Sequence, residues 1–185
     1  VPAPLPVLKA MEEYLSRFPF NYGVGVWRRT VEAAARVDEA RRIAARALGA
    51  TSEKEIAFTK NTTEAINLVA QGLRWKDGDE IVLTTLEHQS NAIPWMRAAQ
   101  EHGGRVRFVP ADADGMVDPG DVRKAMTSAT RLVACTHVSN VFGTIQPVKE
   151  IARIAHEHGA LAFVDAAQSA GRIPVRVDEI GCDFA

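Results

Sequence analysis

Short apolar segments alternate with longer amphipathic segments from Ile56 to Val164 of this chain. The apolar segments predict strands over residues 56–59, 81–84, 106–109, 132–136 and 161–164. Apolar residues at helical spacing predict helices over residues 62–73, 93–102, 119–126 and 148–158. Strands that alternate with helices indicate an α/β fold with three layers, in which a doubly wound, mostly parallel sheet lies between helices.

The first 49 residues have a different pattern. They predict a helix over residues 7–17, ended by Pro19, a loop over residues 21–25, and a longer helix over residues 30–48 before Gly49. We therefore expect two parts, an N-terminal helical segment of residues 1–49 and an α/β domain of residues 50–185.

Charge and cysteine content narrow the classes of function. The formal net charge is -1, and no block of like charge or long apolar run is present, so we expect no nucleic-acid and no membrane partner. Cys135 and Cys182 are far apart and do not form a disulfide framework. A reducing, cytoplasmic location is therefore expected.

The segment Leu161–Gln168 ends a predicted buried strand with an acidic residue, Asp165. Ligands of open α/β sheets bind beyond the carboxyl ends of the strands, where an aspartate can pair with a protonated ring nitrogen of a cofactor. Gln168 follows three residues later and could reach the same ligand. Alternatively, Asp165 caps the next turn and Gln168 lies at the surface.

A second candidate lies where the helix over residues 62–73 begins. Asn61 can cap this helix, and Glu64 stands where a capping box requires it. Thr62 and Thr63 then combine two hydroxyls with unpaired N–H groups and a favourable helix dipole, which suit a phosphate group. A plain capped helix without a ligand is the alternative.

Two further strand ends carry polar residues, His88 after residues 81–84 and Asn140 after residues 132–136. An imidazole can stack on an aromatic ring and exchange protons. Taken singly, His88 could be a loop histidine and Asn140 a turn residue before Gly143. Polar groups at four corresponding places favour one shared ligand.

These motifs together resemble those of a known family. Segments 61–67 (NTTEAIN), 87–95 (EHQSNAIPW), 137–144 (HVSNVFGT) and 164–168 (VDAAQ) have the order and spacing of class V aminotransferase-like enzymes. These are fold-type I enzymes that depend on pyridoxal 5'-phosphate. The sequence is most similar to the cysteine desulfurase and selenocysteine lyase group.

The resemblance implies a role for each site residue. Thr62 and Thr63 would bind the cofactor phosphate. His88 would stack on the pyridine ring, and it is the catalytic residue expected to move a proton to or from the substrate.

The same resemblance assigns the other side of the cofactor ring. Asp165 would pair with the pyridinium nitrogen, and Asn140 and Gln168 would lie near the phenolic oxygen. The implied reaction mobilises sulfur from L-cysteine and leaves L-alanine, with selenocysteine as a related substrate. A sulfur-acceptor protein, iron–sulfur cluster assembly and a homodimer are implied as well.

The family's Schiff-base lysine comes one short strand after the aspartate, whereas the last lysine here is Lys149. We therefore expect residues 50–185 to be an incomplete large domain without the small C-terminal domain, and the 185 residues to be inactive alone. Alternatives are another class V enzyme, such as an aminotransferase, an epimerase or a kynureninase-like lyase. A different class is a non-catalytic phosphate-binding or interaction module.

Two acidic or histidine-containing clusters could suggest a metal. His156-Glu157-His158 lies at a helix end, where such side chains favour the dipole. Residues 112–115 lack the oxygen ligands and the distal glutamate of a calcium loop and predict a turn. We expect no metal site.

Overall fold

The computed structural model describes residues 2–17, 19 and 27–185, which form two compact units. One unit contains the residues up to Arg46 and Thr51–Ile56, and the other contains Ala47–Ala50 and Ala57–Ala185. Residues 21–25, for which a loop is predicted, lie outside the described residues.

Helices α1 (Leu5–Arg17) and α2 (Arg28–Leu48) and the 3-10 helix η1 (Glu53–Glu55) make up most of the first unit. Both α-helices agree with the predicted helices, and each begins two residues earlier than predicted. The Arg36 guanidinium joins them by binding the Glu13 carboxylate at 3.0 Å. Both side chains are exposed, so this ion pair contributes little stability.

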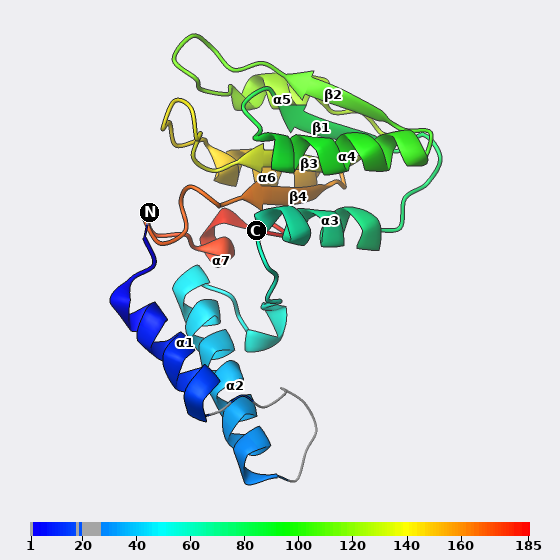
Figure 1. Ribbon diagram of the computed structural model, residues 1–185. Helices are drawn as coiled ribbons and strands as arrows, with labels where there is room; N and C mark the ends of the chain where they lie inside the picture. Colours follow the sequence, from blue (N-terminus) through cyan, green and yellow to red (C-terminus); the bar gives the residue numbers. More distant parts are fainter. Residues whose placement is uncertain (1, 18, 20–26) are drawn as a thin grey trace. The chain divides into compact units, whose positions relative to one another are not determined.

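The second unit is built on a four-stranded sheet whose paired strands are all parallel (Figure 1). The strand order is β2 (Arg105–Val109), β1 (Glu80–Thr84), β3 (Thr130–Thr136) and β4 (Leu161–Asp165). The chain passes from β1 to β2 on one side and then crosses to β3 on the other. The topological switch point therefore lies between β1 and β3, and the carboxyl ends of these strands are the expected place for a ligand.

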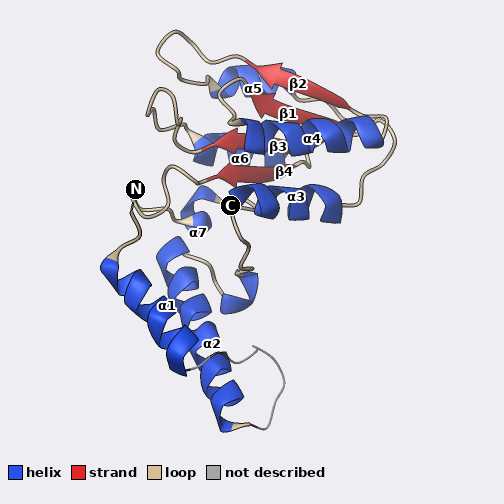
Figure 2. Ribbon diagram, in the orientation of Figure 1, coloured by secondary structure: helices blue, strands red, loops and turns tan. Residues whose placement is uncertain are grey.

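Helices lie on both faces of the sheet (Figure 2). Helices α3 (Thr62–Gly72) and α4 (Gln89–Glu101) cover one face, and α5 (Pro119–Ala125) and α6 (Val148–Glu157) cover the other. The predicted fold, a doubly wound parallel sheet between two helical layers, is confirmed.

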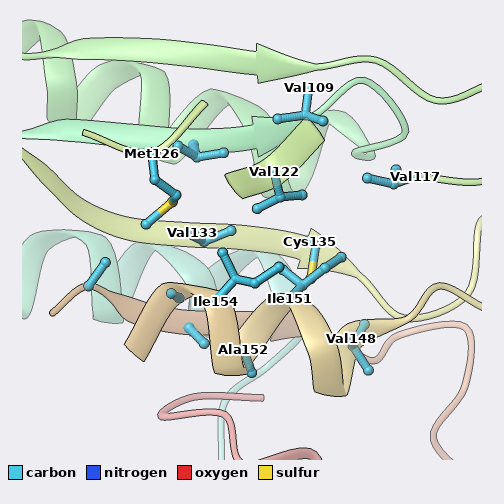
Figure 3. Packing of buried hydrophobic residues seen from close by; sticks show 14 of the residues in the cluster. Val109, Val117, Val122, Met126, Val133, Cys135, Val148, Ile151, Ala152 and Ile154 are labelled. Atoms are coloured by element: carbon cyan, nitrogen blue, oxygen red, sulfur yellow. The ribbon is translucent and has the colours of Figure 1, made fainter. Parts of the chain in front are cut away.

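Alternation along the strands produces two cores. Ile81 and Leu83 of β1 pack toward α3 and α4, whereas Val82 between them packs toward α5 and α6. In the core between the sheet and helices α5 and α6, Ile151 and Ile154 of α6 lie against Val133 and Cys135 of β3 (Figure 3). Each fully buried Ile, Leu or Val side chain contributes about 1.5–3 kcal/mol relative to an exposed one.

Two predicted elements need correction. Residues 56–59 form no strand, and they pair with none of the described strands. Helix α4 begins at Gln89 rather than at Ile93, so Pro94 lies inside the helix. A side-chain cap at His88 starts the helix early and offsets the hydrogen bond that the proline ring removes.

Sequence reasoning did not include the short helix α7 (Val177–Ile180) or the pairing of the final residues. Phe184 forms a parallel bridge with Phe163, and the Val164 N–H donates to the Phe184 carbonyl at 2.9 Å. The Phe163 and Phe184 rings stack with centroids 6.4 Å apart. The chain thus begins to add backbone pairing beside β4.

Candidate functional site

Helix α3 begins with a capped first turn. Asn61 Oδ1 accepts a hydrogen bond from the Glu64 N–H at 2.9 Å, and Glu64 Oε2 accepts one from the Lys60 N–H at 2.6 Å. The reciprocal capping bonds expected from the sequence are present, with the glutamate reaching one residue before the cap. The N–H groups of Thr62 and Thr63 donate to no partner in the described part of the chain. They are available to an anion at the positive end of the helix dipole.

His88 is the N-cap of α4. Its Nδ1 accepts a hydrogen bond from the Ser90 N–H at 3.2 Å and lies 2.9 Å from Ser90 Oγ. Because Nδ1 acts as an acceptor, a neutral His88 ring carries its proton on Nε2. The side chain is exposed, so the ring can stack on a ligand and exchange a proton through Nε2.

The residue before His88, Glu87, was not among the predicted site residues. Its Oε1 accepts hydrogen bonds from the Thr84 hydroxyl at 2.5 Å and the Thr136 N–H at 2.9 Å, and its Oε2 accepts one from Asn91 Nδ2 at 2.5 Å. Burial raises the pKa of Glu87 to about 7, against the lowering effect of these donors. The only sequence signal was an acidic residue directly beside the histidine.

Asn140 lies in a tight turn after β3. Val138 and Ile145 form an antiparallel bridge, and the Gly143 N–H donates to the Ser139 carbonyl at 2.9 Å. Gly143 has a φ of 75°, which favours glycine. Asn140 is exposed at this turn, which projects from the end of β3.

Asp165 ends β4 and is buried, with 6% of its surface exposed. Its Oδ1 accepts a hydrogen bond from the Ala167 N–H at 2.9 Å, so it does cap the next turn, as one reading of the sequence held. Its Oδ2 accepts no hydrogen bond from the described residues. Gln168 is half-buried, and its Oε1 accepts a hydrogen bond from the Arg172 guanidinium.

Backbone pairing brings several of these positions to one edge of the sheet. Thr136 of β3 pairs with Asp165 of β4, and the His137 N–H donates to the Asp165 carbonyl at 2.9 Å. Glu87 joins β1 to β3, and the charge of Asp165 contributes to its raised pKa. Figure 1 shows α3 and α4 beginning at the edge toward which the strands run. Neither Asn140 nor Gln168 has a hydrogen bond to Asp165.

His137 lies at the same edge and is buried. Its Nδ1 is the one buried side-chain nitrogen or oxygen without a hydrogen-bond partner among the residues that the structure describes. Burial lowers the pKa of His137, so the neutral ring is favoured. His137 is the first residue of the motif over residues 137–144, but the sequence predicted no role for it.

The clusters considered for metals have other partners. His156 Nε2 lies 2.9 Å from Asp183 Oδ2, and His158 Nδ1 lies 2.9 Å from the Ile154 carbonyl. Asp112 Oδ1 accepts hydrogen bonds from main-chain N–H groups at positions 114 and 116, so residues 112–116 form a turn. Within the described ranges, no group of three or more His, Cys, Asp or Glu residues is arranged to hold a metal.

Neither cysteine lies in a setting that favours a reactive thiolate. Cys135 and Cys182 are both free, and burial raises the pKa of each thiol. Cys135 lies in the core beside α6, as its mid-strand position predicted. Among the described helices, none combines the length and apolarity needed to cross a bilayer.

Comparison of the sequence identifies relatives over nearly its whole length. The aminotransferase class-V family model matches residues 2–185. A probable cysteine desulfurase of Methanothermobacter thermautotrophicus is 51% identical over 184 residues, which cover 100% of this chain and 46% of that protein. The chain thus spans less than half the length of the first curated relatives that it matches.

Solved structures agree with the sequence comparison. The apo structure of cysteine desulfurase from Thermococcus onnurineus NA1 matches with a TM-score of 0.92 at 41% identity, covering 100% of this chain and 47% of that one. A C-DES mutant with glycine covalently linked to its PLP cofactor matches with a TM-score of 0.82 at 27% identity, covering 98% and 48%. The fold, the motifs and these matches show that the chain belongs to the class V aminotransferase family.

Proposed function

We propose that this chain forms the cofactor-binding large domain of a pyridoxal-phosphate-dependent cysteine desulfurase. The observation that carries the proposal is the carboxylate of Asp165, buried at the end of β4 with Oδ2 open to a ligand. The names of the sequence and structural relatives support L-cysteine as the substrate and L-alanine as the product left after sulfur removal.

The residues at the carboxyl edge fit the cofactor. A protonated ring nitrogen would satisfy Asp165 Oδ2, and the negative charge of Asp165 would in turn keep that nitrogen protonated. The unpaired N–H groups and hydroxyls of Thr62 and Thr63 would bind the phosphate. When bound, pyridoxal phosphate supplies an electron sink for negative charge at the substrate α-carbon.

The remaining site residues orient the ring and move a proton. His88 would stack on the ring and would transfer a proton to or from the substrate through Nε2, the nitrogen that is not engaged by Ser90. Asn140 and Gln168 would lie near the phenolic oxygen of the cofactor. Because Gln168 Oε1 already binds Arg172, its amide NH2 is the group left for this contact.

The partners follow from the same assignment. The substrate is L-cysteine, with selenocysteine as a related substrate, and the sulfur of cysteine passes to an acceptor protein, which connects the enzyme to iron–sulfur cluster assembly. The enzyme works as a homodimer in the cytoplasm. The lysine that binds the cofactor covalently matches no lysine of these 185 residues, so tests of activity need the full-length protein.

The test replaces the charge of Asp165 and keeps its shape. In the full-length protein, Asp165→Asn is expected to lower alanine release from cysteine by about 100-fold or more, since an amide cannot keep the ring nitrogen protonated. Asp121→Asn, on α5 at the other face, is the matched control and is expected to leave turnover unchanged. Wild-type protein that binds pyridoxal phosphate but releases no alanine from cysteine would refute the proposed substrate.

A further inference from the structure

Glu87 connects three segments that meet at the switch point of the sheet. Its carboxylate holds the end of β1 through the Thr84 hydroxyl and the end of β3 through the Thr136 N–H. It also holds the first turn of α4 through Asn91 Nδ2. Removing this one side chain would therefore release three contacts at the place where the site is built.

The network continues into the core. Asn91 is fully buried, and its Oδ1 accepts a hydrogen bond from Trp95 Nε1 at 2.9 Å. The Trp95 ring packs edge-on against Phe163 of β4, with centroids 5.1 Å apart. The Asn91 amide thus binds Glu87 through its NH2 group and Trp95 through its oxygen. These contacts connect Glu87 to α4 and, through the Trp95 ring, to β4.

We propose that Glu87 is a positioning residue that ties the ends of β1 and β3 to α4 and thereby fixes where the adjacent His88 lies. The side chain of His88 is held by Ser90 alone among the described residues, and its carbonyl accepts hydrogen bonds from the Asn91 and Ala92 N–H groups at 2.7 and 3.0 Å. His88 therefore moves with the first turn of α4, which Glu87 holds through Asn91. The inference rests on the proposed role of His88 in stacking on the cofactor.

The electrostatics of Glu87 make the positioning of His88 depend on pH. Its three donors are neutral groups, Asp165 on β4 faces it with a like charge, and its own charge raises the pKa of Cys135 on β3. With a pKa of about 7, Glu87 changes charge near neutrality. The ionised carboxylate accepts all three bonds, whereas the protonated form has to find an acceptor for its own proton. We expect His88 to be held more firmly above pH 7 than below it.

The experiment uses the full-length protein without cofactor, labelled selectively in its histidines, with the His88 signals assigned by His88→Gln. Glu87→Gln keeps an acceptor for Thr84 and Thr136 but turns an NH2 group toward the NH2 group of Asn91. Adding Asn91→Asp supplies an acceptor for that NH2 group and keeps one for Trp95. Glu101→Gln, at the exposed far end of α4, is the matched control.

At pH 8 we expect Glu87→Gln to shift the His88 ring signals and to weaken pyridoxal phosphate binding, followed by its absorption, by about tenfold. The size is taken from the lower end of the loss seen when the hydrogen-bond partner of a metal-binding histidine is removed. The Glu87→Gln/Asn91→Asp pair is expected to restore both measurements, and Glu101→Gln to change neither. The difference in the His88 signals between the wild type and Glu87→Gln should also shrink as the pH falls below 7, where Glu87 itself is protonated.

Unchanged His88 signals and unchanged cofactor affinity in a folded Glu87→Gln protein would overturn the proposal, even if the protein were less stable. Should that variant not fold, Thr84→Val removes one of the three bonds and is expected to shift the His88 signals in the same direction. An unshifted His88 in Thr84→Val would then overturn it. A wild type that binds no pyridoxal phosphate would refute the proposed function, while the His88 spectra would still decide the role of Glu87.

Discussion

Two glutamates stand at opposite ends of strand β1 in opposite surroundings. At the amino end, Glu80 binds the Arg107 guanidinium through both carboxylate oxygens, at 2.7 and 2.9 Å, and accepts a hydrogen bond from the Thr127 hydroxyl at 2.6 Å. Arg107 lowers the pKa of Glu80. At the carboxyl end, burial raises the pKa of Glu87 to about 7, and its donors are neutral.

The difference distinguishes an edge of the sheet where an ion pair stabilises the fold from the edge where we propose that the cofactor binds. A bidentate guanidinium satisfies its carboxylate and favours the ionised form. The carboxyl edge instead keeps Glu87 and Asp165 near each other, and neither has a basic partner within the described ranges, which costs stability. Perturbed carboxyl groups of this kind gather at functional sites, and a positively charged ligand would relieve their repulsion.

The largest expected effect comes from breaking the Glu87 network at its buried centre. Asn91→Leu leaves Glu87 Oε2 and Trp95 Nε1 without partners in a buried setting. We expect the free energy of unfolding to fall by about 3–4 kcal/mol, measured by urea denaturation. Asn67→Ala, which removes one local bond to the Thr63 carbonyl on α3, should cost less than about 1 kcal/mol. Equal losses of unfolding free energy in the two variants would show that the buried network stabilises the fold no more than a single exposed hydrogen bond does.

The second effect is the pH dependence of stability, which should differ between the two glutamates. Because the folded pKa of Glu87 is about 7 against an ordinary 4.5, its stabilising contribution is complete below pH 4.5 and is lost as pH rises through 7. The loss is on the order of 3 kcal/mol. Glu87→Gln removes this dependence, so unfolding free energies measured between pH 5 and pH 8 should fall less steeply in the variant. Parallel curves for the two proteins would contradict a raised pKa at Glu87.

The sequence predicted the strands and the position of Asp165 but not Glu87, for a physical reason. Apolar runs specify buried strands locally, and Asp165 follows its strand directly. The environment of Glu87 depends on Thr136, which lies far along the chain and is brought near only when β1 pairs with β3. The strand predicted over residues 56–59 was wrong because an apolar run forms a strand only where a partner strand is available.

A smaller effect is expected at the amino end of β1. Glu80→Gln removes the charge that Arg107 binds, and since Arg107 is partly exposed to water we expect a loss of about 1–2 kcal/mol at pH 7. The pKa of Glu80 is lowered, so its contribution is present above pH 4.5 and is lost as pH falls through the lowered value. The cost of Glu80→Gln, measured by urea denaturation, should therefore shrink in acid. The contribution of Glu80 to stability should thus fall in acid, whereas that of Glu87 should fall as the pH rises.

The smallest effect tests whether geometry or charge matters at Glu80. Arg107→Lys keeps the positive charge but replaces two directed bonds from a planar fork with a single ammonium group. We expect the urea midpoint to fall by less than in Glu80→Gln, and the difference between the two variants to narrow in 1 M salt, where exposed charges are screened. If Arg107→Lys instead lowered the midpoint as far as Glu80→Gln, the bidentate geometry rather than the charge would hold this edge. The two ends of β1 would then differ in the geometry of their hydrogen bonds rather than in charge.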